Sequence, residues 1–198
     1  KAFGISVSDD DLKALLSTAR EDVINLSGYE NPKTKNAHDL ALFAKRAKNA
    51  GWGYVWGTYG EVLTARAFQQ KLRQYPAEIG AEKKFISENY LGKRTADCVG
   101  LIKGYLWLNP ETKRIEYGRG GHADVGADGM FEKAKEKGTI SSIPKIPGIA
   151  VWQKGHIGIY VGDGKVIEAA NTRAGILETR LSAGTWTHWL KVPGVSYE

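Results

Sequence analysis

The pattern of apolar residues changes near Ser141, and this change constrains the fold more than any other feature. Before it, apolar residues recur at helical spacing in several segments. After it, short β-branched runs alternate with glycine turns, which is typical of antiparallel strands. Helices followed by strands predict an α+β fold, with helices packed on a central antiparallel β-sheet.

The first half of the chain is expected to be mainly helical. Ser8 precedes three aspartates and then leucines at helical spacing, which predicts a capped helix to about residue 19. A second helix is expected over about 36–50, and helical patterns resume over roughly 62–73 and 81–90. We therefore expect a helical extension at 1–35 and a main domain at 36–198.

Strands are expected in the last third of the chain, at 149–152, 156–161 and 165–169. Gly162-Asp163-Gly164 joins the second and third of these as a hairpin. A short helix at about 128–137 precedes them, and the tail near Trp186 and Trp189 adds a further strand.

Composition excludes several classes of protein. The single cysteine, Cys98, excludes an intrachain disulfide framework and any multi-thiolate metal site. The formal net charge of +6 favours polyanionic partners, but no nucleic-acid-reading motif is present. No apolar run is long enough for a membrane span, and no convincing metal-binding set or cofactor motif is found.

Cys98 is the candidate nucleophile. It begins a segment with apolar residues at helical spacing, and either Thr95 or Asp97 is placed to cap the helix. At a helix N-terminus the dipole and the free N–H groups lower the pKa of a thiol, and they also stabilise an oxyanion. We therefore expect a reactive thiolate.

A nucleophilic thiol needs a base, and His156 is the best placed of the four histidines. It opens a strand, where a side chain faces a cleft more often than a core. His38, His122 and His188 are expected to be surface, loop or packed residues.

The hairpin register decides which group orients His156. A two-residue loop would make Asn171 its partner, whereas a three-residue loop would bring Glu168 to the same face. We favour the second register, because glycine at the third loop position suits a bulged hairpin. Glu168 would then accept from one ring nitrogen and the other would face Cys98. The residues alone leave a solvated Glu168 equally open.

Three stretches resemble the NlpC/P60 superfamily of papain-like cysteine peptidases. They are Tyr-Val-Trp-Gly at 54–57, Asp-Cys-Val-Gly-Leu-Ile at 97–102, and His-Ile-Gly-Ile-Tyr-Val-Gly-Asp-Gly-Lys-Val-Ile-Glu-Ala at 156–169. The resemblance implies a bacterial cell-wall hydrolase that cuts peptidoglycan stem peptides between D-γ-glutamyl and a diamino acid, without a cofactor. It assigns Cys98 as nucleophile, His156 as base and Glu168 as orienter.

The resemblance also implies roles for residues around the nucleophile. Tyr54 would lie near the thiol and the oxyanion, and Asp97 would meet the free amine of the stem peptide. Val99 stands where the family usually has serine, so anchoring of the substrate is expected to differ. Glu168 stands where histidine, asparagine or glutamine is commoner, and a helical insertion at about 58–96 is expected to wall the cleft.

These features look like the version found in firmicute and phage wall lysins. A secreted or wall-located monomer is therefore expected, or one released at lysis or carried on a virion if a phage encodes it. Two alternatives remain open. One is an N-acetylmuramoyl-L-alanine amidase or acyltransferase on the same fold, and the other is an inactive wall-binding module.

Overall fold

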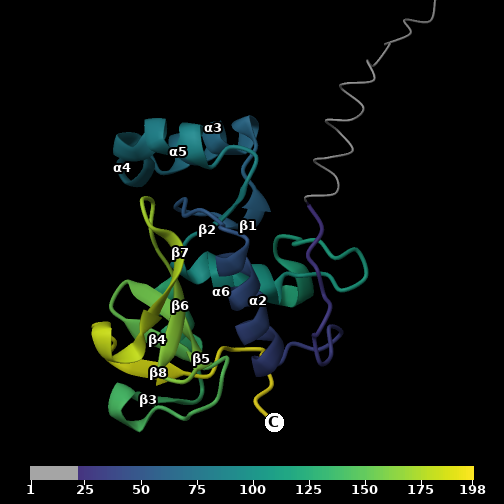
Figure 1. Cartoon of the computed structure of the whole chain (residues 1–198), viewed down its shortest axis with the longest axis vertical. Coiled ribbons are helices and arrows are strands. Elements are labelled where there is room, and N and C mark those ends of the chain that lie inside the picture. Colours follow the sequence, from purple (N-terminus) through teal and green to yellow (C-terminus); the bar gives the residue numbers. More distant parts are fainter. Residues whose placement is uncertain (1–21) are drawn as a thin grey trace, which may run out of the picture.

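The computed structural model describes residues 22–198, and Figure 1 shows how their helices and strands are arranged. The α-helices are α2 (Ala37–Asn49), α3 (Ala65–Gln74), α4 (Pro76–Ile79), α5 (Lys83–Asn89), α6 (Cys98–Leu106) and α7 (Ala127–Lys133). Short 3₁₀ turns are η1 (Gly80–Glu82), η2 (Arg119–Gly121), η3 (Ile140–Ser142) and η4 (Leu181–Ala183).

The central sheet is antiparallel and has the strand order β3-β8-β4-β5-β6-β7. Its strands are β3 (Lys137–Thr139), β4 (Ala150–Gln153), β5 (His156–Gly162), β6 (Lys165–Asn171), β7 (Gly175–Arg180) and β8 (His188–Leu190). A separate pair, β1 (Tyr59–Val62) and β2 (Arg94–Ala96), brackets the helices α3 to α5.

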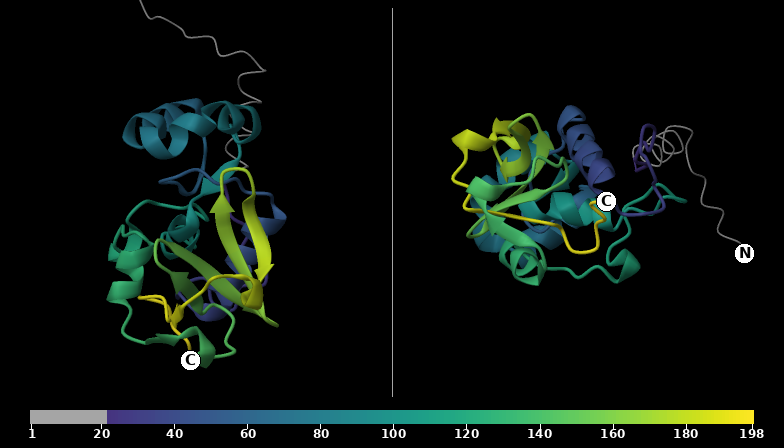
Figure 2. Two further views of the ribbon diagram at one scale, coloured as in Figure 1. Left: turned by 90° about the vertical axis from the view of Figure 1, so that its left-hand side faces the viewer. Right: turned by 90° about the horizontal axis from the view of Figure 1, so that it is seen from below.

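Two helices cover one face of the central sheet. α2 and α6 pack against each other and against β5 and β6, and Figure 2 shows them beside the sheet. Ile157 and Ile159 of β5 meet Leu101 and Ile102 of α6 in the main core. The opposite face carries a smaller core around Val166 and Trp186. Within residues 22–198, no helix has the length and apolar character needed to cross a bilayer.

The segment between β1 and β2 has a core of its own. Phe68 of α3, Ile79 of α4 and Ile86 of α5 are buried together with Val55 and Leu63. Figure 1 shows α3, α4 and α5 gathered at one end of the molecule. This unit lies within the helical insertion expected at 58–96, and two short strands tie it to the main domain.

The α+β prediction is confirmed, and most element positions agree with it. Three predictions need correction. The helical pattern at 62–73 starts with the last residue of strand β1 and becomes helix only at Ala65, and the helix expected over 128–137 ends at Lys133, before strand β3. Strands β2, β3 and β7 were not foreseen. The helix expected over 8–19 lies outside the described residues. Residues 22–35, the described part of the expected helical extension, form turns and loops and no helix.

The β5–β6 hairpin combines features of both registers considered from the sequence. Gly162 pairs with Lys165 across the two-residue turn, and a bulge follows. Beyond the bulge Ile159 pairs with Ile167, which is the register that the sequence analysis favours. As a result, Glu168 and His156 lie on the same face of the sheet.

We predict that Gly100→Ala destabilises the fold. A Cβ atom at Gly100 would lie 1.9 Å from the carbonyl oxygen of Thr58, so α6 and the 57–58 loop must separate. The expected loss is about 3 kcal/mol in the free energy of unfolding, measured by urea titration.

The matched control is Gly80→Ala. Gly80 has helical backbone angles and nothing near the added methyl group, so stability should hold or rise by about 0.4–1 kcal/mol. Equal stability of the two variants would show that the 57–58 loop moves away freely.

Candidate active site

Asp97 fixes the start of the helix that carries Cys98. Its Oδ1 atom accepts the N–H of Gly100 at 2.6 Å, and its Oδ2 atom accepts the N–H of Gly57 at 2.8 Å. Asp97 is thus the N-cap of α6, one of the two caps considered from the sequence. Both oxygens are used by backbone donors, so contact with a substrate amine stays a prediction.

Cys98 lies in the first turn of α6 and is only 7% exposed. Burial and the neighbouring Asp97 carboxylate raise the pKa of the Cys98 thiol to about 12, against the N–H groups of Ile157 and Val99. The low pKa expected from the helix dipole is therefore wrong. The thiol is protonated at neutral pH and needs a base to become a nucleophile.

His156 is hydrogen-bonded to Glu168, the partner that the favoured hairpin register predicts. Its Nε2 atom lies 2.7 Å from Oε2 of Glu168, and Oε1 of Glu168 accepts the hydroxyl of Thr179 on β7 at 2.7 Å. Burial acts to raise the pKa of Glu168, but the bonds from His156 and Thr179 outweigh it and hold that pKa below its ordinary value. The imidazole ring also stacks on Trp186, with centroids 5.3 Å apart.

Cys98 and His156 approach each other at the start of β5. The backbone N–H of Ile157, the residue after His156, is directed at the Cys98 sulfur. In the described part of the chain no hydrogen bond joins the thiol to the imidazole, whose Nδ1 atom is not engaged by Glu168. The catalytic pairing of these two residues therefore stays a prediction.

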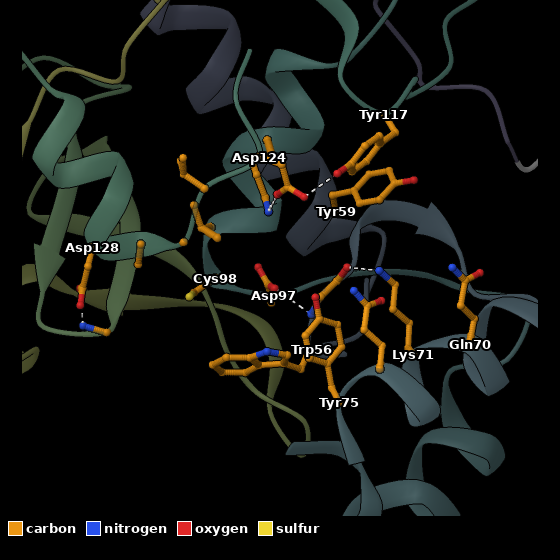
Figure 3. A pocket seen from close by; sticks show the side chains of 18 residues that line it. Trp56, Tyr59, Gln70, Lys71, Tyr75, Asp97, Cys98, Tyr117, Asp124 and Asp128 are labelled. Carbon is orange, nitrogen blue, oxygen red and sulfur yellow. Dashed lines mark hydrogen bonds and ion pairs between the residues drawn. The ribbon is translucent and has the colours of Figure 1, made fainter. Parts of the chain in front are cut away.

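Cys98 opens into a cavity of about 700 Å³ between the insertion and the main domain. Figure 3 shows Trp56, Tyr75 and Lys71 on one side of the sulfur and Asp128 on the other. Residues from α3, the 56–59 loop, α6 and the 124–128 segment line it, with Gly155 at the mouth of β5. The insertion thus walls the cleft, as expected from the sequence.

Charged side chains of both signs line this cleft. Lys103 of α6 is buried and its Nζ atom lies 2.5 Å from Asp124, which also accepts the hydroxyl of Tyr117 at 2.7 Å. Asp128 accepts the N–H of Gly155 at 2.7 Å, next to His156. Such a cleft suits a zwitterionic ligand better than an apolar one.

Tyr54 and Val99 lie near Cys98, and both are buried. Tyr54 belongs to the same core cluster as Cys98. Burial raises the pKa of Tyr54, and the Cys98 and Asp97 charges raise it further, so its phenol is a hydrogen-bond donor. Val99 is a cleft-lining residue with little exposure. The substrate contacts of both stay predictions.

Sequence reasoning missed several residues of the cleft. Trp56 is 40% exposed and lines the cavity. Its position in the Tyr-Val-Trp-Gly motif was the available signal. Lys71, Asp124 and Asp128 carried no sequence signal, because only the tertiary packing brings them to Cys98. His38, His122 and His188 do not line the cavity.

Comparison with solved structures finds NlpC/P60 domains among the chains similar to this one. No family model matches the sequence, and no curated protein does. The NlpC/p60 domain of the peptidoglycan hydrolase SagA is similar with a TM-score of 0.45 and 16% identity, over 78% of this chain and 97% of that chain. The peptidoglycan hydrolase RipB from Mycobacterium tuberculosis gives 0.44 and 16%, over 94% and 87%.

NlpC2 from Trichomonas vaginalis is also similar, with a TM-score of 0.45 and 17% identity over 82% of this chain. The present chain spans only about half of that protein, 51% of its length.

We predict that iodoacetamide near pH 7 alkylates Cys98 more slowly in the folded chain than in the urea-unfolded chain. Only the thiolate reacts, and burial together with the Asp97 charge raises its pKa when the chain is folded. Intact-mass spectrometry measures both rates.

The matched variant is Asp97→Asn, which keeps a capping side chain but removes the charge, so alkylation of its folded state should be faster than in the wild type. Faster alkylation of the folded wild type than of the unfolded chain, persisting near pH 6, would instead show a thiolate–imidazolium pair.

Proposed function

We propose that the chain is a peptidoglycan hydrolase, a cysteine endopeptidase that cuts stem peptides at the D-γ-glutamyl–L-diamino acid bond. The observation that carries the proposal is the hydrogen-bond chain from Thr179 through Glu168 to His156. This chain orients the imidazole of His156 at the start of β5. The N–H of the next residue, Ile157, is directed at the Cys98 sulfur. A nucleophile, a base and an orienter are the parts that this chemistry needs.

The proposed reaction has two steps. As the Cys98 sulfur attacks the scissile carbonyl carbon, Nδ1 of His156 takes the thiol proton and the carbonyl oxygen becomes an oxyanion. The Cys98 N–H and the Tyr54 hydroxyl stabilise that charge. The C–N bond then breaks, His156 protonates the leaving amine, and a thioester remains. Water, deprotonated by His156, releases the acid and restores the thiol.

Because the pKa of Cys98 is raised, the thiol still carries its proton when the substrate binds. His156 must therefore remove that proton, which a preformed thiolate–imidazolium pair would already have transferred. The base must accept the proton during attack, so its orientation by Glu168 limits the rate directly. Charged groups of both signs in the cleft suit a stem peptide, which carries carboxylates and amines. The net charge of +6 favours anionic wall polymers, consistent with the proposed location outside the cell or at the wall.

Digestion of purified peptidoglycan, followed by mass spectrometry of the soluble fragments, tests the proposal. We expect products cut between D-glutamate and the diamino acid, and a loss of about 10³-fold or more in Cys98→Ala and His156→Ala. The control is His38→Ala, since His38 has a half-exposed side chain on α2 and does not line the cleft.

Two other results would replace the proposal. Release of intact stem peptides from the glycan would show an amidase. Retention on the wall without any products, in a chain that folds, would show a binding module.

We predict that Glu168→Gln is less damaging than loss of Cys98 or His156. An amide oxygen still accepts a hydrogen bond from the ring, but the stabilising charge is gone, so kcat should fall about ten- to hundredfold. Steady-state hydrolysis of a stem peptide measures it.

The control is Asn171→Ala. Asn171 is exposed at the end of β6, where its side chain accepts turn N–H groups of Arg173 and Ala174. A fully active Glu168→Gln beside an inactive Asn171→Ala would refute the assignment of Glu168.

A further inference from the structure

Lys71 is a cation held at the wall of the cleft by the insertion. It lies on the face of α3 that also presents Gln70 and Gln74 to the cavity. Its Nζ atom donates to the carbonyl oxygen of Gly57 at 2.5 Å and lies 5.9 Å from the centroids of both Tyr59 and Tyr75. The ammonium group is therefore fixed in place before any ligand binds.

Most of the hydrogen-bonding capacity of Lys71 is unused. An ammonium group has three N–H donors, and only the bond to Gly57 is present among residues 22–198. In the same part of the chain no carboxylate lies within ion-pair distance of it, whereas the other cleft lysine, Lys103, is neutralised by Asp124 at 2.5 Å. Lys71 thus presents to the cavity a positive charge that no carboxylate pairs with directly.

Three carboxylates, those of Asp97, Asp124 and Glu61, act on the Lys71 charge from beyond ion-pair distance. Asp97 is bonded to backbone N–H groups and Asp124 to Lys103. Glu61 is engaged as well. Its carboxylate accepts the N–H of Tyr59 at 2.6 Å. Burial raises the pKa of Glu61 to about 7, so the group is partly protonated at neutral pH. It weakly compensates the charge of Lys71 and leaves the donors free.

Packing makes the position of Lys71 rigid. Gly57 has a φ of +78°, and a Cβ atom there would lie 2.3 Å from the ring of Tyr75, so the insertion rests directly on the Tyr-Val-Trp-Gly loop. The same glycine donates its N–H to Asp97. The Lys71 ammonium is therefore linked through Gly57 and Asp97 to the helix that carries Cys98.

Lys71 and His156 lie on different sides of Cys98, and this placement indicates which part of a substrate contacts Lys71. The leaving amine must lie on the His156 side, because His156 protonates it. Asp128, bonded to the N–H of Gly155, marks that side, and Figure 3 shows Lys71 on the other side of Cys98. The group that reaches Lys71 therefore belongs to the acyl part of the substrate.

We infer that Lys71 is a specificity-determining residue that binds the free α-carboxylate of a D-γ-glutamyl acyl group. This inference rests on the proposed function. In a γ-linked glutamyl residue the α-carboxylate stays free and lies a few bonds from the scissile carbonyl. An amidated residue presents a neutral group there, so the cleft distinguishes the acid from the amide by charge.

Two matched peptides, L-Ala-γ-D-Glu-L-Lys and its α-amide L-Ala-γ-D-isoGln-L-Lys, test the inference. We expect the wild type to prefer the acid about tenfold or more in kcat/KM. Lys71→Gln should remove most of that preference by slowing the acid alone, and Lys71→Arg should restore part of it. Lys84→Gln is the control, because Lys84 is 85% exposed on the same insertion and does not line the cleft.

The ratio of the cleavage rates of the acid and amide peptides distinguishes carboxylate binding by Lys71 from a general structural effect of the substitution. If Lys71→Gln slows both peptides equally, or if the wild type cuts both equally well, the assignment of Lys71 is overturned while the proposed function stands. If the folded wild type cuts neither peptide, the proposed function fails and the inference about Lys71 fails with it.

Discussion

Asp97 joins the two segments that carry the candidate site, because each of its carboxylate oxygens accepts one backbone N–H. The bond from Gly100 sets the first turn of α6, and the bond from Gly57 holds the aromatic loop against that turn. Burial raises the pKa of Asp97, and Lys103 and the two N–H groups counter it. A buried carboxylate is tolerated only when donors satisfy it, so the loop and the helix are positioned together.

The insertion is anchored at two places, and both bear on the site. On one side Tyr75 packs on Gly57 next to the cleft. On the other side the Tyr90 hydroxyl donates to the carbonyl of Thr172 at 2.6 Å, and Arg173 pairs with Glu82 at 2.8 Å. The turn after β6, the strand that carries Glu168, thus braces the wall of the cleft. The same turn therefore contacts the helices of the insertion and follows the strand whose Glu168 binds His156.

Local pattern was enough to predict the parts of the site that lie close together in sequence. The bulged hairpin fixed Glu168 relative to His156, since register depends on loop length and on glycine at a defined position. The cap at Asp97 followed from helix-start chemistry. The exposed Trp56 and the cleft position of Lys71 were not predictable, because they depend on how the insertion docks. Alternation and helical periodicity identify buried faces and not the partners of exposed ones.

The pKa of the Cys98 thiol depends on two opposing effects, the helix dipole that lowers it and burial that raises it. A helix N-terminus stabilises a negative charge by about 0.3–2 kcal/mol. Burial with an adjacent carboxylate raises the Cys98 pKa from 9.0 to about 12, which corresponds to about 4 kcal/mol. Desolvation therefore outweighs the dipole at Cys98. Under the proposed mechanism a base must therefore take the thiol proton. The proposed base, His156, is held by Glu168, and Glu168 is held in turn by Thr179 on the next strand.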